Sequence, residues 1–494
     1  MSKLSLQELE AHLWGAANIL RGKIDSSDYK TYIFGLLFFK RISDVWEEEY
    51  EDRLAKYKNN EKLAASPDEH RFHIPKHCFW ADIRKHTTNI GAELNRAFHA
   101  IEDANTRLKG IFQDVDFNNK DRFPDATLEK LLQHFDKYRL RNAEVEGDVL
   151  GNAYEYLIKQ FADDAGKKGG EFYTPKQVVR LLVEILRPDA GMSIYDGACG
   201  SGGMLLECCA SLRRRKKNPK SLRLYGQENN LNNWAICRIN MFLHDIDDAF
   251  IERGDTLRHP KHLVGNGKTL MTFDRVIANP PFSLKEWGHD EWSKGDPYGR
   301  SEYGVPPKGY GDLAFVEHFI WSLNDKGMLG VVLPHGVLFR GGAEGQIRQR
   351  MIDADLVEAV IGLAGNLFYG ASIPACLLIV NKKKPAERKG KILIINGAEE
   401  YVEGKAKNDL SQANVDKLAA AFHAYADVDR FARVVPVDEV IANDYNLNLT
   451  RYVQTAEPEP EIDVKAEYKK LQTLVKERDA AEARMQEYMK ELGY

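Results

Sequence analysis

The chain has 494 residues, of which 43% are hydrophobic and 29% charged; this length and composition predict two or three globular domains with buried cores. Its formal net charge of -5 argues against a protein that holds nucleic acid through bulk positive charge. No apolar run approaches the length of a membrane span, residues 1–10 lack a signal-peptide core, and the six cysteines have neither disulfide nor zinc-ligand spacing. We therefore expect a protein of the reduced cytoplasm, with free thiols and no membrane partner.

The segment 1–146 is expected to form a helical N-terminal domain. Within residues 29–45 the apolar side chains recur at helical spacing and predict a helix with a broad buried face. His73, His77 and Cys78 lie close together in this segment. Because no second cluster completes the four ligands of a structural metal site, we expect no bound metal.

The segment 147–455 changes to alternating strand and helix patterns. Short apolar runs separated by helical patterns occur at residues 192–195, 222–225, 273–278, 328–333, 357–361 and 376–380. This alternation predicts an α/β domain with a mostly parallel sheet and helices on both faces. Ligands of such sheets bind at the carboxyl ends of the strands, so the residues just after each run are the candidate site.

The segment 456–494 is expected to be a linker followed by a helical arm. Residues 456–461 read Ala-Glu-Pro-Glu-Pro-Glu, which is typical of a linker. The apolar residues beyond it share one 3.5-residue seam, interrupted by Arg478 and Glu482: Val464, Tyr468, Leu471, Val475, Met485, Met489 and Leu492. Two interpretations stay open, a helix folded back on its own domain and a docking arm for a partner.

A glycine-rich loop follows the first predicted strand, at residues 196–203 (Asp-Gly-Ala-Cys-Gly-Ser-Gly-Gly). Its glycines allow a sharp bend and a close approach of the backbone to a ligand. Glu228, after the next strand, is placed to accept hydrogen bonds from ribose hydroxyls. The loop is neither a GxGxxG nor a P-loop sequence, so a nucleoside without phosphates, such as S-adenosylmethionine (AdoMet), fits it better than a nucleotide.

The catalytic candidate is the sequence Asn279-Pro280-Pro281-Phe282, directly after the run 273–278. An amino group conjugated to a ring is a poor nucleophile because its lone pair is delocalised. The Asn279 carboxamide oxygen and the Pro280 carbonyl can accept hydrogen bonds from both of its N–H groups and so favour a pyramidal nitrogen. The prolines fix the backbone, and Phe282 offers a face on which a flipped base can stack.

With these motifs in place, the chain resembles the modification subunits of type I restriction–modification systems, which are adenine-N6 DNA methyltransferases. Residues 13–44 resemble that family's N-terminal helical domain, and residues 311–319 and 330–336 resemble later motifs of its AdoMet-dependent methyltransferase (Rossmann-like) fold. The resemblance implies that residues 170–175 close over the methionine part of AdoMet through Glu171, Phe172, Tyr173, Thr174 and Pro175.

The same resemblance implies a role for each residue of the loops. The cofactor loop would be formed by Asp196, Gly197, Gly200, Ser201, Gly202 and Gly203, with Glu228 on the ribose and Asp255 facing the cofactor adenine. Asn279, Pro280, Pro281 and Phe282 would form the catalytic motif. The family commonly has proline where Gly197 stands, and we expect glycine to make this turn looser.

No DNA-reading domain is visible in the sequence, in agreement with the acidic net charge. The family resemblance implies that DNA is read by a separate specificity subunit, with two modification subunits for each specificity subunit. A restriction subunit joins them in the full complex. Two alternatives remain, a glutamine-N5 protein methyltransferase and an AdoMet-binding assembly scaffold without turnover.

Two further segments each have two interpretations. The basic residues 213–217 could touch phosphates, although a solvated loop between a helix and a strand is favoured. Residues 283–310 are rich in Gly, Pro, Lys and Trp and follow the catalytic motif. We favour a mobile loop over the flipped base for this segment, with a passive insertion as the alternative.

Overall fold

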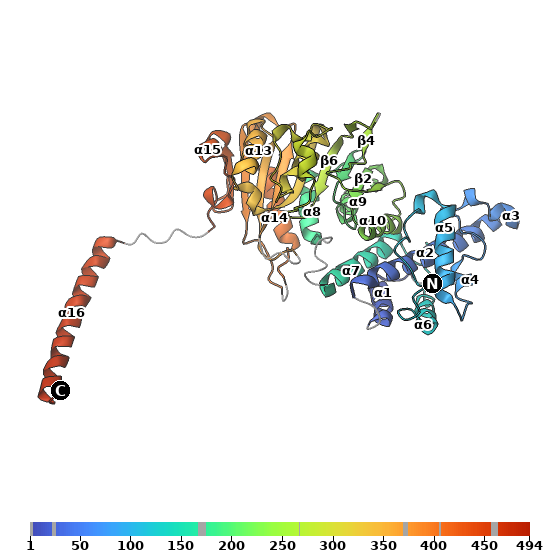
Figure 1. Cartoon of the computed structure of the whole chain (residues 1–494), viewed down its shortest axis with the longest axis horizontal. Coiled ribbons are helices and arrows are strands. Elements are labelled where there is room, and N and C mark those ends of the chain that lie inside the picture. The colour runs from blue at the N-terminus through green and yellow to red at the C-terminus, as the bar shows by residue number, and fades with distance from the viewer. Residues whose placement is uncertain are drawn as a thin grey trace. The chain divides into compact units, whose positions relative to one another are not determined.

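The computed structural model describes residues 3–21, 26–165, 174–265, 267–368, 374–404, 407–455 and 463–494. It divides into two compact units, Met1–Val453 and Gln454–Tyr494. The first unit contains a helical part and a sheet part, and the second contains one long helix (Figure 1). No helix of the described ranges is both long and apolar enough to cross a membrane.

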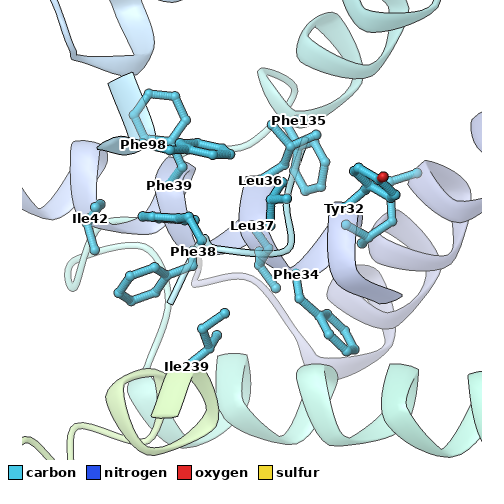
Figure 2. Packing of buried hydrophobic residues seen from close by; sticks show 14 of the residues in the cluster. Tyr32, Phe34, Leu36, Leu37, Phe38, Phe39, Ile42, Phe98, Phe135 and Ile239 are labelled. Carbon is cyan, nitrogen blue, oxygen red and sulfur yellow. The ribbon is translucent and has the colours of Figure 1, made fainter. Parts of the chain in front are cut away.

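The helical part consists of α1 (Leu6–Leu20), α2 (Ser26–Lys56), α3 (Glu61–Ala64), α4 (Trp80–Ile83), α5 (Ile90–Ala104), α6 (Asp125–Phe135) and α7 (Gly147–Ala165). The helix expected at residues 29–45 is confirmed as the middle of α2. Its aromatic and aliphatic side chains, Phe34, Phe38 and Phe39 among them, are almost completely buried at the centre of this part (Figure 2). α7 packs into the same core, although it lies beyond residue 146.

The sheet has nine strands in the order β11-β10-β8-β9-β7-β6-β1-β2-β3. They are β1 (Ser193–Asp196), β2 (Arg223–Glu228), β3 (Phe250–Arg253), β6 (Phe273–Ala278), β7 (Leu323–Pro334), β8 (Val357–Leu363), β9 (Ala375–Asn381), β10 (Lys391–Gly397) and β11 (Ala432–Pro436). A separate hairpin pairs β4 (Leu263–Val264) with β5 (Thr269–Leu270). Only the pairs β7–β9, β8–β9 and β10–β11 of the nine-stranded sheet are antiparallel. The mostly parallel sheet is thus confirmed.

Two apolar cores lie on the two faces of the sheet, because successive strand side chains point to opposite faces. One core holds side chains of α8 (Lys176–Leu186), α9 (Gly203–Arg214) and α14 (Gln412–Ala424). The other holds side chains of α12 (Asp312–Trp321), α13 (Gly342–Asp353) and α15 (Val437–Ala442), with α11 (His289–Ser293) in the connection after β6. Helices on both faces are therefore confirmed.

The helix α10 (Leu231–Leu243) joins the sheet part to the helical part. Trp234, Cys237 and Met241 belong to one core of the sheet. Ile239 and Phe242 belong to the helical core, where Ile239 faces Phe34 and Phe38 (Figure 2). Both parts consequently share one helix, and the division at residue 146 remains a prediction.

The second unit is the helix α16 (Val464–Glu491), 28 residues long. Its first turn is capped by Asp463, whose carboxylate accepts hydrogen bonds from the backbone N–H groups of Lys465 and Ala466. The predicted helical arm is therefore confirmed as a helix. No second helix or strand of the described residues lies in this unit, so the apolar seam has no partner within it.

Candidate functional site

The carboxyl ends of β1, β2, β3 and β6 meet at one cavity of about 810 Å³. Because these strands are parallel neighbours, the loops that follow them lie at the same edge of the sheet. The structure brings together ten of the predicted site residues in the cavity wall: Thr174, Asp196, Gly197, Gly200, Ser201, Gly203, Glu228, Asp255, Asn279 and Pro281.

Four other predicted residues do not line this cavity: Pro175, Gly202, Pro280 and Phe282. Gly202 precedes α9 with φ +82, a conformation that favours glycine. The Phe282 ring packs beside Phe368, with 6.0 Å between ring centroids. Three predicted residues, Glu171, Phe172 and Tyr173, lie outside the described residues.

The glycine-rich loop is held to the strand beside it by Glu228. One carboxylate oxygen of Glu228 accepts a hydrogen bond from the Gly200 N–H at 2.9 Å, and the other accepts one from the Asn230 N–H at 2.8 Å. Each oxygen keeps acceptor capacity for a ligand hydroxyl. Burial raises the pKa of Glu228, and the backbone hydrogen bonds offset part of this effect. Glu228 thus both shapes the loop and lines the cavity.

Asp196 and Asp255 lie at two other strand ends of the cavity. Asp196 is buried and accepts a hydrogen bond from the Ala198 N–H at 3.0 Å. Burial raises its pKa to about 8, with a smaller contribution from the charge of Glu228. The Asp255 carboxylate accepts hydrogen bonds from the backbone N–H groups of Leu257 and Arg258. Both carboxyl groups therefore fix their own turns at the cavity wall.

The turn at Gly197 is tightly packed, and the expectation that glycine makes it looser than proline would stays a prediction. A Cβ at this position would lie 2.7 Å from a ring carbon of Phe319 and 2.9 Å from the Tyr195 hydroxyl. Phe319 and Tyr195 are almost completely buried, so neither can readily move. The Thr256 hydroxyl also donates a hydrogen bond to the Gly197 carbonyl at 2.5 Å. This packing is possible because Gly197 has no Cβ.

We expect Gly197→Ala to lower the free energy of unfolding by about 1–3 kcal/mol, because the methyl group overpacks a filled site. Urea unfolding of the ligand-free chain measures the effect. Gly203→Ala is the matched control, since a Cβ there meets no atom within 4 Å. Equal unfolding free energies for the two variants would contradict the packing explanation.

Asn279 follows β6 and presents its carboxamide at the cavity. Its amide nitrogen donates a hydrogen bond to the Thr174 hydroxyl at 2.9 Å. Its carboxamide oxygen is buried and accepts no hydrogen bond from any described residue. A buried acceptor without a partner is costly unless a ligand satisfies it. The Thr174 contact thus orients Asn279 so that its oxygen stays free for a donor in the cavity.

The backbone just after the catalytic motif is held by Asp312, to which the sequence assigned no role. Ser283 has φ +54, which is unusual for a residue other than glycine. Its N–H donates a hydrogen bond to the buried Asp312 carboxylate at 2.8 Å, and the Gly311 N–H donates one to the Leu284 carbonyl at 2.9 Å. Asp312 therefore fixes the end of the catalytic loop from the first residue of α12.

The segment 283–310 is anchored by three buried side chains, Trp287, Trp292 and Arg300. Arg300 forms an ion pair with Asp296 at 2.6 Å and donates a hydrogen bond to the Leu257 carbonyl at 2.8 Å. These contacts favour the interpretation of a packed insertion over that of a mobile loop.

The basic segment 213–217 is largely paired within the chain. Arg213 pairs with Asp148 at 2.7 Å, Arg214 with Glu207 at 2.7 Å, and Lys217 with Asp189 at 2.6 Å. A phosphate would have to compete with these carboxylates. The pairing therefore favours the solvated structural loop over a phosphate-binding patch.

Comparison with known proteins decides the family. A family model described as N-6 DNA Methylase matches residues 145–461, and one described as HsdM N-terminal domain matches residues 9–135. The type I restriction enzyme MjaVIII methylase subunit of Methanocaldococcus jannaschii is 33% identical, over 96% of this chain and 82% of the relative. The chain belongs to the type I restriction enzyme methylase subunits.

Further relatives match this methylase subunit along most of its length. The MpnII methylase subunit of Mycoplasma pneumoniae is 32% identical, over 92% of this chain and 91% of the relative. The crystal structure of a type I restriction–modification methyltransferase subunit from Streptococcus thermophilus superposes with a TM-score of 0.80 at 29% identity, covering 91% of this chain and 100% of that one. The methylase subunit is accordingly an N6-adenine DNA methyltransferase of the AdoMet-dependent fold, and the glutamine-N5 alternative is set aside.

Proposed function

We propose that the cavity binds AdoMet and presents it to an adenine flipped out of DNA, with Asn279 as the catalytic residue. The observation that carries this proposal is the buried Asn279 oxygen, which accepts no hydrogen bond from the described residues. Asn279 lines the same cavity as Glu228 and the glycine-rich loop. The wall fits a nucleoside better than a nucleotide, because the carboxylates of Asp196, Glu228 and Asp255 at the strand ends would repel a phosphate there.

The residues divide into those that hold the cofactor and those that act on the base. Glu228 and Asp255 would accept hydrogen bonds from the ribose and the adenine of AdoMet, and the cofactor loop would hold the rest: Asp196, Gly197, Gly200, Ser201, Gly202 and Gly203. When bound, AdoMet supplies an activated methyl group. Thr174 and Pro175 would contact its methionine part, as the family resemblance implies for residues 171–175, and Thr174 also orients Asn279.

The chemistry of the chain itself takes place at Asn279-Pro280-Pro281-Phe282. The Asn279 oxygen and the Pro280 carbonyl would accept hydrogen bonds from the two N–H groups of the adenine amino group. Both acceptors are preorganised, by Thr174 and by the rigid prolines, so they favour the pyramidal nitrogen of the transition state over the flat nitrogen of the substrate. Phe282 would stack on the flipped base after rotating from its place beside Phe368.

The partners are proposed from the family. We infer that a specificity subunit reads the DNA and that each specificity subunit binds two methylase subunits. A restriction subunit would join them in the full complex. We infer that this assembly acts in the cytoplasm. One solved neighbour, described as a type I R-M system complex, matches 98% of this chain with a TM-score of 0.66 at 20% identity, which supports the fold. The apolar seam of α16, which has no partner within its own unit among the described residues, supports a docking role.

Glu228→Ala tests the cofactor assignment. The variant loses both the ribose acceptor and the hydrogen bond to Gly200, so we expect the dissociation constant for AdoMet to rise at least about tenfold. Isothermal titration calorimetry on the purified chain measures it. Glu252→Ala is the control, since Glu252 is exposed on the neighbouring strand β3. Unchanged AdoMet affinity in Glu228→Ala would contradict the assignment.

A further inference from the structure

The cavity extends beyond the loops of the sheet and is closed on another side by the helical part. One face of α7 lines it, through four polar side chains at positions i, i+3, i+4 and i+7: Asn152, Glu155, Tyr156 and Lys159. The opposite face of α7, with Tyr154, Leu157 and Phe161, is buried in the helical core. The helical part therefore supplies a polar wall to the cofactor cavity.

Charges of both signs meet in this part of the cavity. Glu155 of α7 pairs with Lys176 of α8 at 3.6 Å. Glu10 of α1 and Glu207 of α9 also line the wall, and burial raises the pKa of Glu207. Lys159 forms no ion pair with a described residue. A ligand group that carries one positive and one negative charge fits this wall. A DNA phosphate fits it poorly, because three carboxylates would repel it.

The order of the strand ends indicates which part of the cofactor reaches this wall. Asp255 follows β3 and Glu228 ends β2, so the proposed adenine and ribose positions lie over these two strands. The strand order continues to β1 and β6, where the loop 196–203 and Asn279 lie. The remaining end of the cofactor therefore extends from the loop after β1 toward Gly203, Lys176 and the α7 wall, all of which line the same cavity.

We infer that the polar face of α7, together with Lys176, is the subsite for the α-amino acid end of the cofactor. Lys159 and Lys176 face its carboxylate, and Glu155 and Glu10 face its ammonium group. This inference rests on the proposed AdoMet site. Because α7 belongs to the helical core, a bound cofactor contacts the helical part and the sheet part at the same time.

Two nucleosides that differ only in this end provide the test. S-adenosylhomocysteine carries the amino acid end, whereas 5′-methylthioadenosine has the same thioether nucleoside without it. Calorimetry on the full-length chain compares wild type with Lys159→Ala and Glu155→Gln. We expect each variant to lower the affinity for S-adenosylhomocysteine about tenfold. The affinity for 5′-methylthioadenosine should change less than about twofold.

Two further variants serve as matched controls. Lys130→Ala removes an exposed lysine of α6 away from the cavity and should change neither affinity. Asp255→Ala should lower the affinity for both nucleosides, because both carry the adenine. If the α7 variants lowered the affinities for both nucleosides equally, or changed neither affinity, the subsite assignment would be wrong. Failure of the wild-type chain to bind either nucleoside would overturn the AdoMet site itself, and the subsite with it.

Discussion

Replacing Asn279 by alanine is expected to lower the rate of methyl transfer at least about a hundredfold. The variant removes the buried oxygen that would accept a hydrogen bond from the adenine amino group, and this acceptor acts most strongly in the transition state. The AdoMet affinity should stay within about twofold of wild type, because the Asn279 oxygen is assigned to the adenine of DNA, whereas Glu228 and Asp255 are assigned to the cofactor. Single-turnover transfer of a radioactive methyl group, measured with the specificity subunit present, gives the rate.

Thr174→Val is the informative companion to Asn279→Ala. It keeps the size of the side chain but removes the hydrogen bond that orients Asn279. We expect a smaller loss of rate than in Asn279→Ala, since the acceptor remains but is less well placed. If Asn279→Ala instead lost AdoMet affinity in proportion to its rate, Asn279 would be a structural element of the cofactor cavity and the division of roles would be wrong.

Removal of residues 461–494 is expected to abolish co-purification with the specificity subunit while leaving AdoMet binding intact. The segment 454–494 is a compact unit of its own, so Met1–Val453 should still unfold cooperatively without it. An apolar seam along a 28-residue helix needs a surface to bury against. Pull-down of the tagged specificity subunit, together with calorimetry, measures both properties.

A pair of substitutions tests whether the apolar seam itself binds the specificity subunit. Leu471→Asp places a charge on the seam of α16, and Gln472→Asp places the same charge beside it. We expect only Leu471→Asp to release the specificity subunit. If the truncated chain aggregates and loses AdoMet binding, the arm packs against its own domain, as the first interpretation of the sequence proposed.

Much of the sheet could be predicted because buried strands are short apolar runs. The six predicted runs correspond to β1, β2, β6, β7, β8 and β9. β3 could not be found in this way, since it is an edge strand in which only Ile251 is buried. β10 was missed although its run Ile392–Ile395 is fully buried, so the pattern was sufficient to find it.

The candidate site could be predicted where its residues follow strands, and not where tertiary packing supplies them. Residues such as Asp196, Glu228 and Asn279 stand just after or at the end of their strands, so periodicity and motif together located them. The contact of Asp312 with Ser283 joins residues 29 positions apart, and no local pattern encodes it. The α7 wall is even harder to predict from the sequence, because a polar helix face that lines a cavity has the same pattern as a solvent-exposed face.

We propose that this methylase subunit transfers a methyl group to adenine N6 through Asn279. The most direct measurement reconstitutes the chain with its specificity subunit, supplies AdoMet and unmethylated DNA, and digests the DNA to nucleosides for mass spectrometry. We predict N6-methyladenine with the wild-type chain, and none above background with Asn279→Ala or without the specificity subunit. Methylation on cytosine, or equal N6-methyladenine from Asn279→Ala, would contradict the account.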